Sequence, residues 1–266
     1  MTTFSFESKL DRADQHLHAL ERKIDRWRAG HPYGIVDDID PETLENVVRL
    51  KPTRSIPPTL PLLIGECLYN LRSALDHLVQ ELAFYKDRLR LPGLSITIRF
   101  RPYFDDTQFP ICCNEGQFTS KGARDIGRIA PGAQTIIESL QPYHALDLST
   151  HWLWLLDELS NMDKHRAINV AIGVQSGVSL IPPPKTIIKS FQFWGPLGRF
   201  QGEAEILRYI AVSMIDQTTR VKVNFDPAAH IAFAEFPAEG REVLATLIGI
   251  RTYIREEVIP RLTPYL

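Results

Sequence analysis

The sequence predicts an α+β fold: a bundle of three to four long helices with antiparallel β-hairpins and a C-terminal β-rich insertion before the last helix. In several long segments apolar residues recur at steps of three and four, the spacing of one helix face. Other segments are rich in β-branched and aromatic residues and are bounded by proline and glycine. Helices and strands follow no βαβ rhythm and no repeat or linker divides the chain, so we expect a single domain over residues 1–266. We expect helices at about 5–30, 56–86, 130–172 and 238–264, and β-rich segments at about 33–52, 94–118 and 173–236.

The first and last helices carry long, regular apolar stripes. Ser5 is a suitable N-cap for the first helix, and Gly30 followed by Pro32 is a suitable end. Such stripes suit packing within a bundle or against a second chain, so we expect a closed bundle or a homodimer that uses them. The stripes comprise Phe6, Leu10, Ala13, Leu17, Leu20, Ile24 and Trp27 in the first helix, and Val243, Leu247, Ile250, Ile254, Val258 and Leu262 in the last.

The segments that follow the first two helices have strand patterns. Residues 33–52 fit a short hairpin, and residues 109–118 fit irregular structure or a short strand. Residues 95–104 alternate an apolar face with a basic face that carries Arg99 and Arg101. These arginines are candidate RNA-binding residues because a basic face with aromatic neighbours can follow a phosphate backbone. The alternative is a solvated edge strand that its charges protect.

The long helix at 58–86 organises the rest of the chain. It carries polar residues that a helix of the core does not need. Arg72 and Asp76 lie one turn apart on one flank, and a second polar row follows the other flank. His77, in that second row, is either on the solvated side of the helix or a general base, since the pKa of histidine lies near neutrality. The second row comprises Glu66, Asn70, Ser73 and His77, of which Asn70 and Ser73, together with Asp76, are candidate anion- or RNA-binding residues.

A second polar cluster lies on the helix expected over 151–172. At about 100° per residue, Asp163 and Arg166 fall on its apolar face, while Lys164 and His165 point away. Buried charges need partners, and residues three apart can pair, so we expect both to be buried in a structural ion pair, with Arg72 or Asp76 as a third member. The alternatives are an anion site in which the arginines bind phosphate or carboxylate, and a solvated face.

Composition and motifs exclude several functional classes. The chain has 30 basic and 32 acidic residues, so nucleic-acid contact requires a local patch. It has no signal-peptide pattern and no apolar run of membrane-spanning length, so we expect no membrane partner. Its three cysteines do not form a disulfide framework, which indicates the reducing cytoplasm. The common nucleotide-binding, hydrolase and zinc-protease motifs are missing, and we expect no cofactor.

Metal binding is a further alternative for the two polar clusters. His77, Asp163 and His165 are residue types that bind metals. Their spacing supports no metal site, so a metal hydrolase is a remote option and we expect no metal ligands.

Four segments together resemble a widespread family of uncharacterised bacterial proteins. They are NLRSALDHL at 70–78, FPI at 109–111, SLQPY at 139–143 and LWLLDELSNMDKHR at 153–166. The likeness covers roughly residues 55–170 and brings no established activity with it.

More distantly, Arg72 and His77 resemble the Arg-x4–6-His motif of HEPN ribonucleases, which are helical bundles, often dimeric, that cut RNA without metal. The resemblance implies that His77 acts as general base on a ribose 2′-hydroxyl and that Arg72 steadies the phosphate. Because the second polar cluster lies on a neighbouring helix, we count Asp163, His165 and Arg166 as further candidate catalytic residues and Lys164 as a candidate RNA contact. The competing hypothesis is a non-catalytic binding or assembly module in which the polar clusters are structural.

Overall fold

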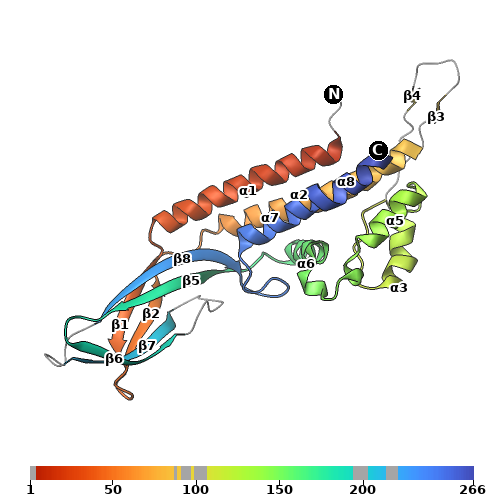
Figure 1. Ribbon diagram of the computed structural model, residues 1–266. Helices are drawn as coiled ribbons and strands as arrows, with labels where there is room; N and C mark the ends of the chain where they lie inside the picture. Colours follow the sequence, from red (N-terminus) through yellow and green to blue (C-terminus); the bar gives the residue numbers. More distant parts are fainter. Residues whose placement is uncertain (1–3, 87–88, 91–96, 99–106, 194–202, 214–220) are drawn as a thin grey trace. The chain divides into compact units, whose positions relative to one another are not determined.

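The computed structural model describes residues 4–86, 89–90, 97–98, 107–193, 203–213 and 221–266, and it confirms the α+β fold (Figure 1). The chain divides into two compact units. The first contains Met1–Leu20, Pro61–Ile168 and Leu244–Leu266, and the second contains Glu21–Leu60 and Asn169–Val243. That these units act as one domain stays a prediction.

The long helices of the first unit form a closed bundle. They are α1 (Ser5–Ala29), which continues into the second unit, α2 (Thr59–Lys86), α6 (Trp152–His165) and α7 (Val243–Tyr253). The C-terminal helix continues through η4 (Ile254–Val258), α8 (Ile259–Leu262) and η5 (Thr263–Tyr265). The shorter elements are α3 (Glu115–Gln117), η1 (Phe118–Gly122), α4 (Ala123–Asp125), α5 (Pro131–Ser139), η2 (Pro142–His144) and η3 (Leu148–Thr150). Two paired strands of two residues each, β3 (Leu89–Arg90) and β4 (Thr97–Ile98), follow α2.

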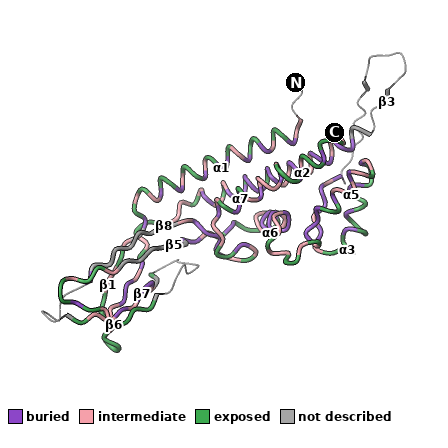
Figure 2. Tube along the Cα trace, viewed as in Figure 1, coloured by how far each residue is buried: buried purple, intermediate pink, exposed green. Residues whose placement is uncertain are grey.

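The two apolar stripes are buried within the chain. Every stripe residue of α1 and of the C-terminal helix is buried, as are the apolar positions of α2 that face them (Figure 2). This burial stabilises the fold, because apolar surface removed from water contributes about 25 cal/mol per Å². The stripes are therefore used in a closed bundle, and the homodimer stays a prediction.

Polar contacts between α1 and its neighbouring helices show how these helices run relative to one another. His16 Nδ1 lies 3.0 Å from Glu66 Oε2, and Ser5 Oγ donates to Glu81 Oε1 at 3.0 Å, so α1 and α2 are antiparallel. Asp14 accepts from Arg251 of α7 at 2.9 and 3.2 Å and from Arg255 at 2.7 Å. These contacts tie the N-terminal helix to both of its partners.

Two glycines let α6 approach its neighbours. A Cβ atom on Gly65 of α2 would lie 2.5 Å from both carboxylate oxygens of Asp163, and a Cβ on Gly249 of α7 would lie 2.5 Å from the Trp152 ring. A larger residue at either position would have to displace α6 or its side chain, so these glycines fix how close the helices come.

Three expected boundaries differ from the structure. The helix expected over 151–172 ends at His165, because Arg166 has extended backbone (φ −162°, ψ 156°) and strand β5 starts at Val170. The last helix starts at Val243 rather than at about residue 238. Residues 109–118 are irregular and then helical from Glu115, so no strand forms there.

The second unit is built from antiparallel strands. Strands β1 (Tyr33–Ile39) and β2 (Asn46–Pro52) form the expected hairpin and belong to a sheet with the order β1-β2-β7-β6. Strands β6 (Thr186–Phe193) and β7 (Ala204–Ser213) complete that sheet. Strands β5 (Val170–Ile181) and β8 (Lys222–Phe233) form a separate ribbon with twelve paired positions, from Val170↔Phe233 to Ile181↔Lys222.

A charge network closes the hairpin turn of that sheet. Arg208 of β7 donates to Glu205, to Asp40 at 2.9 Å and to Glu45 at 3.3 Å. Tyr209, the next residue, is buried and donates its hydroxyl to Asp37 at 3.0 Å. Adjacent residues of β7 thus hold β1 and the turn from opposite faces of the sheet.

Candidate anion-binding pocket

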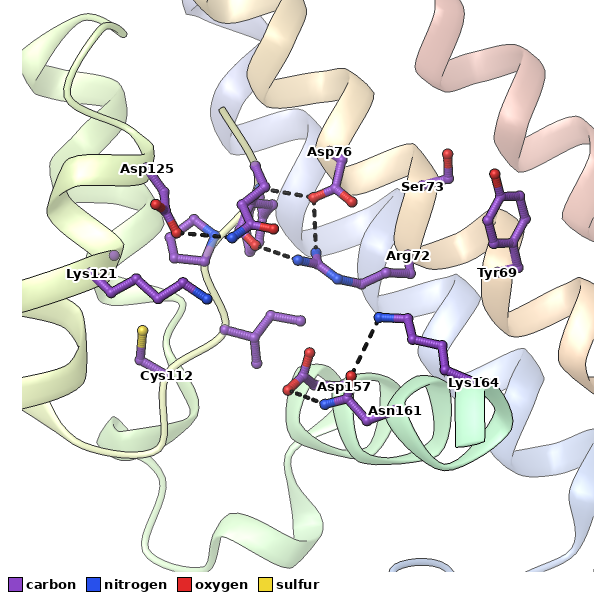
Figure 3. Close-up of a pocket in the computed structure, with 15 residues that line it drawn as sticks. Tyr69, Arg72, Ser73, Asp76, Cys112, Lys121, Asp125, Asp157, Asn161 and Lys164 are labelled. Carbon is purple, nitrogen blue, oxygen red and sulfur yellow. Dashed lines mark hydrogen bonds and ion pairs between the residues drawn. The ribbon is translucent and has the colours of Figure 1, made fainter. Parts of the chain in front are cut away.

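A pocket of about 410 Å³ opens in the first unit (Figure 3). Its walls come from α2, from the irregular segment 107–113, from the η1–α4 turn and from α6. The residues that line it are Tyr69, Arg72, Ser73, Asp76, Gln108, Phe109, Pro110, Ile111, Cys112, Lys121, Gly122, Asp125, Asp157, Asn161 and Lys164.

One wall of the pocket contains an ion pair on α2 that hydrogen-bonds to the backbone of Phe109. Arg72 Nη1 lies 3.2 Å from Asp76 Oδ1. Arg72 Nη2 donates to the carbonyl oxygen of Phe109 at 2.8 Å, and Asp76 Oδ1 accepts from the amide of Phe109 at 3.0 Å. The pair therefore satisfies both polar groups of one buried residue, which is the work that a neighbouring strand would otherwise do.

The other end of this segment is held by Gln141, which is buried. Its Oε1 accepts from the amide of Cys112 at 2.8 Å, and its Nε2 donates to the carbonyl oxygens of Pro110 and Ile137 at 2.9 Å each. A buried segment without regular secondary structure needs such side-chain partners, because its backbone groups have no helix or sheet hydrogen bonds of their own. Arg72 and Asp76 at one end of the segment and Gln141 at the other thus fix the backbone that forms the floor of the pocket.

Each carboxylate of the pocket already accepts a hydrogen bond. Asp125 accepts from Gln108 Nε2 at 3.1 Å, Asp157 accepts from Asn161 Nδ2 at 3.2 Å, and Asp76 accepts from Phe109. Burial raises the pKa of Asp76, and the guanidinium of Arg72 opposes that rise.

The cationic groups are less well satisfied than the carboxylates. Within the described residues, Lys121 Nζ makes no hydrogen bond or ion pair, and Lys164 Nζ has one long contact, 3.4 Å to Asn161 Oδ1. Arg72 Nη1 is buried and, although it is close to Asp76, has no aligned hydrogen-bond acceptor. In Figure 3, Lys121 and Lys164 reach toward the same space from opposite walls. Ammonium groups from two elements therefore face one space, while Arg72 Nη1 points toward Asp76.

The cysteine in the wall is not an activated nucleophile. Burial, helped by nearby acidic groups, raises the pKa of Cys112 to about 11. A thiol with that pKa stays protonated at neutral pH, and only the thiolate is a strong nucleophile.

Four of the candidate residues meet at this pocket: Arg72, Ser73, Asp76 and Lys164. Two others, Asn70 and Asp163, line a second pocket of about 670 Å³ between α1, α2 and α6, together with Lys9, Arg12, His16, Leu62, Gly65, Glu66 and Tyr69. Tyr69 lines both pockets and Lys9 Nζ stands 5.2 Å from the centre of its ring.

The remaining candidates line neither pocket. His77 is half-buried on the flank of α2, where desolvation and the positive charge of Lys9 lower its pKa. His165 and Arg166 are exposed at the C-terminal end of α6. Arg72 and His77 therefore do not meet in either of these two pockets. Arg99 and Arg101 lie outside the described residues.

The expected burial of Arg166 on the apolar face is wrong. The helix ends at His165, one residue before Arg166, so the direction that helical periodicity gives for Arg166 does not apply. Asp163 is half-buried against Gly65, and burial raises its pKa. It has no hydrogen bond or ion pair with any residue that the structure describes.

Residue patterns alone did not single out several residues that build the pocket. Lys121 and Asp125 lie on short helical turns without a periodic stripe. Gln141 and Phe109 belong to the SLQPY and FPI segments of the family resemblance, so that resemblance was the one signal that could have found them. All four resembling segments contribute to the pocket or to its support.

Comparison with family models, curated proteins and solved structures finds no match for this chain. The two resemblances therefore stay predictions. Among the described residues, no group of three or more histidine, cysteine, aspartate or glutamate side chains is placed to hold a metal ion. No helix in the described part of the chain is long and apolar enough to cross a membrane.

Proposed function

We propose that this protein is a binding module for a small anionic ligand, which carries a phosphate or carboxylate group and sits in the pocket beside Arg72. The observation that carries the proposal is that Lys121 and Lys164 reach toward one space beside Arg72 whose carboxylates already accept hydrogen bonds (Figure 3). An oxyanion there would supply the acceptors that these donors lack, and charge-assisted hydrogen bonds are the strong ones.

The size and lining of the pocket fit this class of ligand. Its volume of about 410 Å³ is within the usual range for small-molecule sites, roughly 300–1,000 Å³. Apolar contact comes from Ile111 and from Tyr69, whose side chain is largely exposed. The ligand is therefore an anionic group on a small organic body, or the end of an RNA strand as the HEPN-like resemblance implies.

Binding is favoured over cleavage because of where Arg72 and His77 lie. Arg72 is held by the backbone of Phe109, which gives it a structural role at the edge of the pocket. His77 lines neither pocket, so a general base acting with Arg72 would have to come from elsewhere. Free Cys67, Cys112 and Cys113 support the proposal that the module works in the cytoplasm.

Calorimetric titration with inorganic phosphate, citrate and a mononucleotide at low salt tests the proposal. Replacing Lys121 or Lys164 with glutamine removes one charge-assisted contact, worth about 1.5–3 kcal/mol, and should weaken binding about 10- to 100-fold. The matched control is Lys189→Gln, which removes an exposed lysine of β6 that does not line this pocket. Loss of affinity in the control equal to that in the pocket variants would reject a specific site.

A parallel assay addresses the ribonuclease hypothesis. Fluorescent single-stranded RNA is incubated in EDTA with wild type, Arg72→Ala and His77→Ala. The binding module predicts no cleavage by any of the three. Cleavage by wild type that His77→Ala abolishes would instead support the HEPN-like activity, because loss of a general base costs about 10²–10⁴-fold.

A further inference from the structure

We infer a second anion-binding site, in the second unit, where the last turns of α1 face the segment that leads into α2. A cavity of about 660 Å³ opens there. It is lined by Lys23, Arg26, Trp27, Thr53, Arg54, Ser55 and Pro57. The site is separate from the pocket of the proposed function and shares no residue with it.

The charge of this cavity is wholly positive. Three of its lining residues are cationic, and no carboxylate from the described part of the chain lines it. Within the described residues, the guanidinium groups of Arg26 and Arg54 have no ion pair or hydrogen bond. By contrast, Arg28 and Arg49 of the same unit lie 3.7 Å from Asp25 and Asp38. The cavity therefore concentrates positive charge that the protein itself does not neutralise.

Hydrogen bonds give the cavity a fixed frame. Trp27 Nε1 donates to the carbonyl oxygen of Ser55 at 3.1 Å, and Lys23 Nζ donates to Thr59 Oγ1 at 2.8 Å. Thr53 Oγ1 donates to the carbonyl oxygen of His31 at 2.9 Å. The first two bonds hold the segment that leads into α2 against α1, and the third holds Thr53 against the loop after α1, so the cationic side chains project from fixed backbone.

Gly30 positions the most important of these cations. The guanidinium of Arg54 lies directly against the Cα of Gly30, where a Cβ atom would overlap Arg54 Nη1 and lie 3.3 Å from the carbonyl oxygen of Trp27. A residue with a side chain at position 30 would push the guanidinium away. The position of Arg54 thus depends on the missing side chain of Gly30.

A purely structural role does not account for this cluster. Basic residues in the last turn of a helix interact favourably with its dipole, which explains Arg26. It does not explain Arg54, which comes from another segment and lines the same cavity as Arg26 and Lys23. Like charges repel when they are close, so an arrangement of this kind is stabilised when an anion binds.

The donor chemistry indicates a phosphate-type ligand. Guanidinium groups present paired donors that match two oxygens of a phosphate, and an ammonium adds a point charge. The hydroxyl of Ser55 makes no hydrogen bond with any residue the structure describes and can donate to a third oxygen. A phosphomonoester or diphosphate group fits these donors, whether on a soluble molecule or on a lipid headgroup.

The test is calorimetric titration of the full-length protein with inorganic pyrophosphate at low salt. Arg26→Gln and Arg54→Gln should each weaken binding at least about tenfold. Arg22→Gln, which changes an exposed arginine one turn earlier on α1 that does not line the cavity, should bind like wild type. Gly30→Ala keeps every charge but displaces Arg54, so it should weaken binding about as much as Arg54→Gln.

Two further arms separate this site from its alternatives. A Lys121→Gln/Lys164→Gln variant removes the first pocket's lysines and should retain this binding, so the two proposals fail independently. Vesicles of phosphatidylcholine with phosphatidic acid identify the source: binding that Arg54→Gln weakens indicates a lipid headgroup, and pyrophosphate binding alone indicates a soluble ligand. No pyrophosphate binding by wild type, or equal weakening by Arg22→Gln and Arg26→Gln, overturns the site.

Discussion

Arg72 and Asp76, one turn apart on α2, hold the two polar backbone groups of Phe109 between them. The guanidinium donates to its carbonyl oxygen at 2.8 Å and the carboxylate accepts from its amide at 3.0 Å. Their side chains are 15% and 29% exposed, so the contact is mostly shielded from water. An ion pair that would contribute little on a helix surface becomes the support for one wall of a pocket.

The first prediction concerns this support. Arg72→Ala leaves the Asp76 carboxylate and the Phe109 carbonyl without their shared partner, and should lower the free energy of unfolding by up to about 3–5 kcal/mol. Arg72→Lys should recover only part of the loss, because an ammonium lacks the planar fork that reaches both groups. Urea unfolding measures both. Arg12→Ala, at an exposed position of α1, is the control, and an Arg72→Ala curve that overlays it would contradict a structural role.

The second prediction concerns Gly65 and Asp163. Gly65→Ala should destabilise the protein, since its Cβ would lie 2.5 Å from both Asp163 oxygens. In an Asp163→Ala background the same change should be neutral or stabilising by up to about 1 kcal/mol, because alanine is the better helix former. Thermal melts of wild type, the two single variants and the double variant give the coupling free energy between the two positions.

Asp163→Ala alone is informative as well. The buried ion pair expected from the sequence would make the loss of stability large, because Arg166 would be left buried without its partner. The structure predicts a small one, because Arg166 is exposed and Asp163 has no ion pair within the described residues. A loss of several kcal/mol would show that the two residues do pair.

The third prediction concerns pH. His151 caps α6 by accepting the Leu153 amide at its Nδ1, at 3.2 Å, and burial lowers its pKa. Only the neutral ring can accept there. A histidine whose folded pKa is lowered contributes stability that is complete above its unfolded pKa, about 6.5, and is lost as the pH falls toward the folded pKa. The free energy of unfolding should therefore decline as the solution is acidified below about pH 6.5.

The His151→Asn variant isolates this effect, because asparagine caps helices well and does not titrate. Its stability should decline less steeply than that of wild type below about pH 6.5. His165→Asn, at the exposed far end of the same helix, should keep the wild-type slope. If stability falls with pH equally steeply in all three proteins, His151 does not contribute to the loss of stability in acid. His16 and His77, whose pKa values burial also lowers, would then be the remaining sources of that loss.

The fourth prediction concerns assembly. Leu10, 1% exposed, lies in the buried stripe of α1, so Leu10→Ala should cost about 2–5 kcal/mol in unfolding free energy without changing the molar mass in solution. Leu62→Ala, on the exposed face of α2, should cost far less. Urea unfolding and light scattering measure the two properties. A dimer that Leu10→Ala converts to monomers at unchanged stability would place the stripe in an interface between chains.

The sequence by itself determined the elements with strong local patterns. The stripes on α1, α2 and the C-terminal helix follow from helical periodicity, which depends only on neighbouring residues. The hairpin at 33–52 and the i,i+4 pair of Arg72 and Asp76 are equally local. These features hold whatever the rest of the chain does, and the α+β fold follows from them.

Tertiary structure alone decided where α6 ends and what each polar side chain meets. Periodicity gives a direction around a helix axis, but it does not show that Arg166 lies beyond the helix or that Gly65 stands opposite Asp163. Phe109 becomes the partner of Arg72 from 37 residues away, and Lys121 reaches the pocket from a short turn without a pattern. Such contacts depend on how distant segments pack, because an anion pocket is a property of the space between elements and not of any one of them.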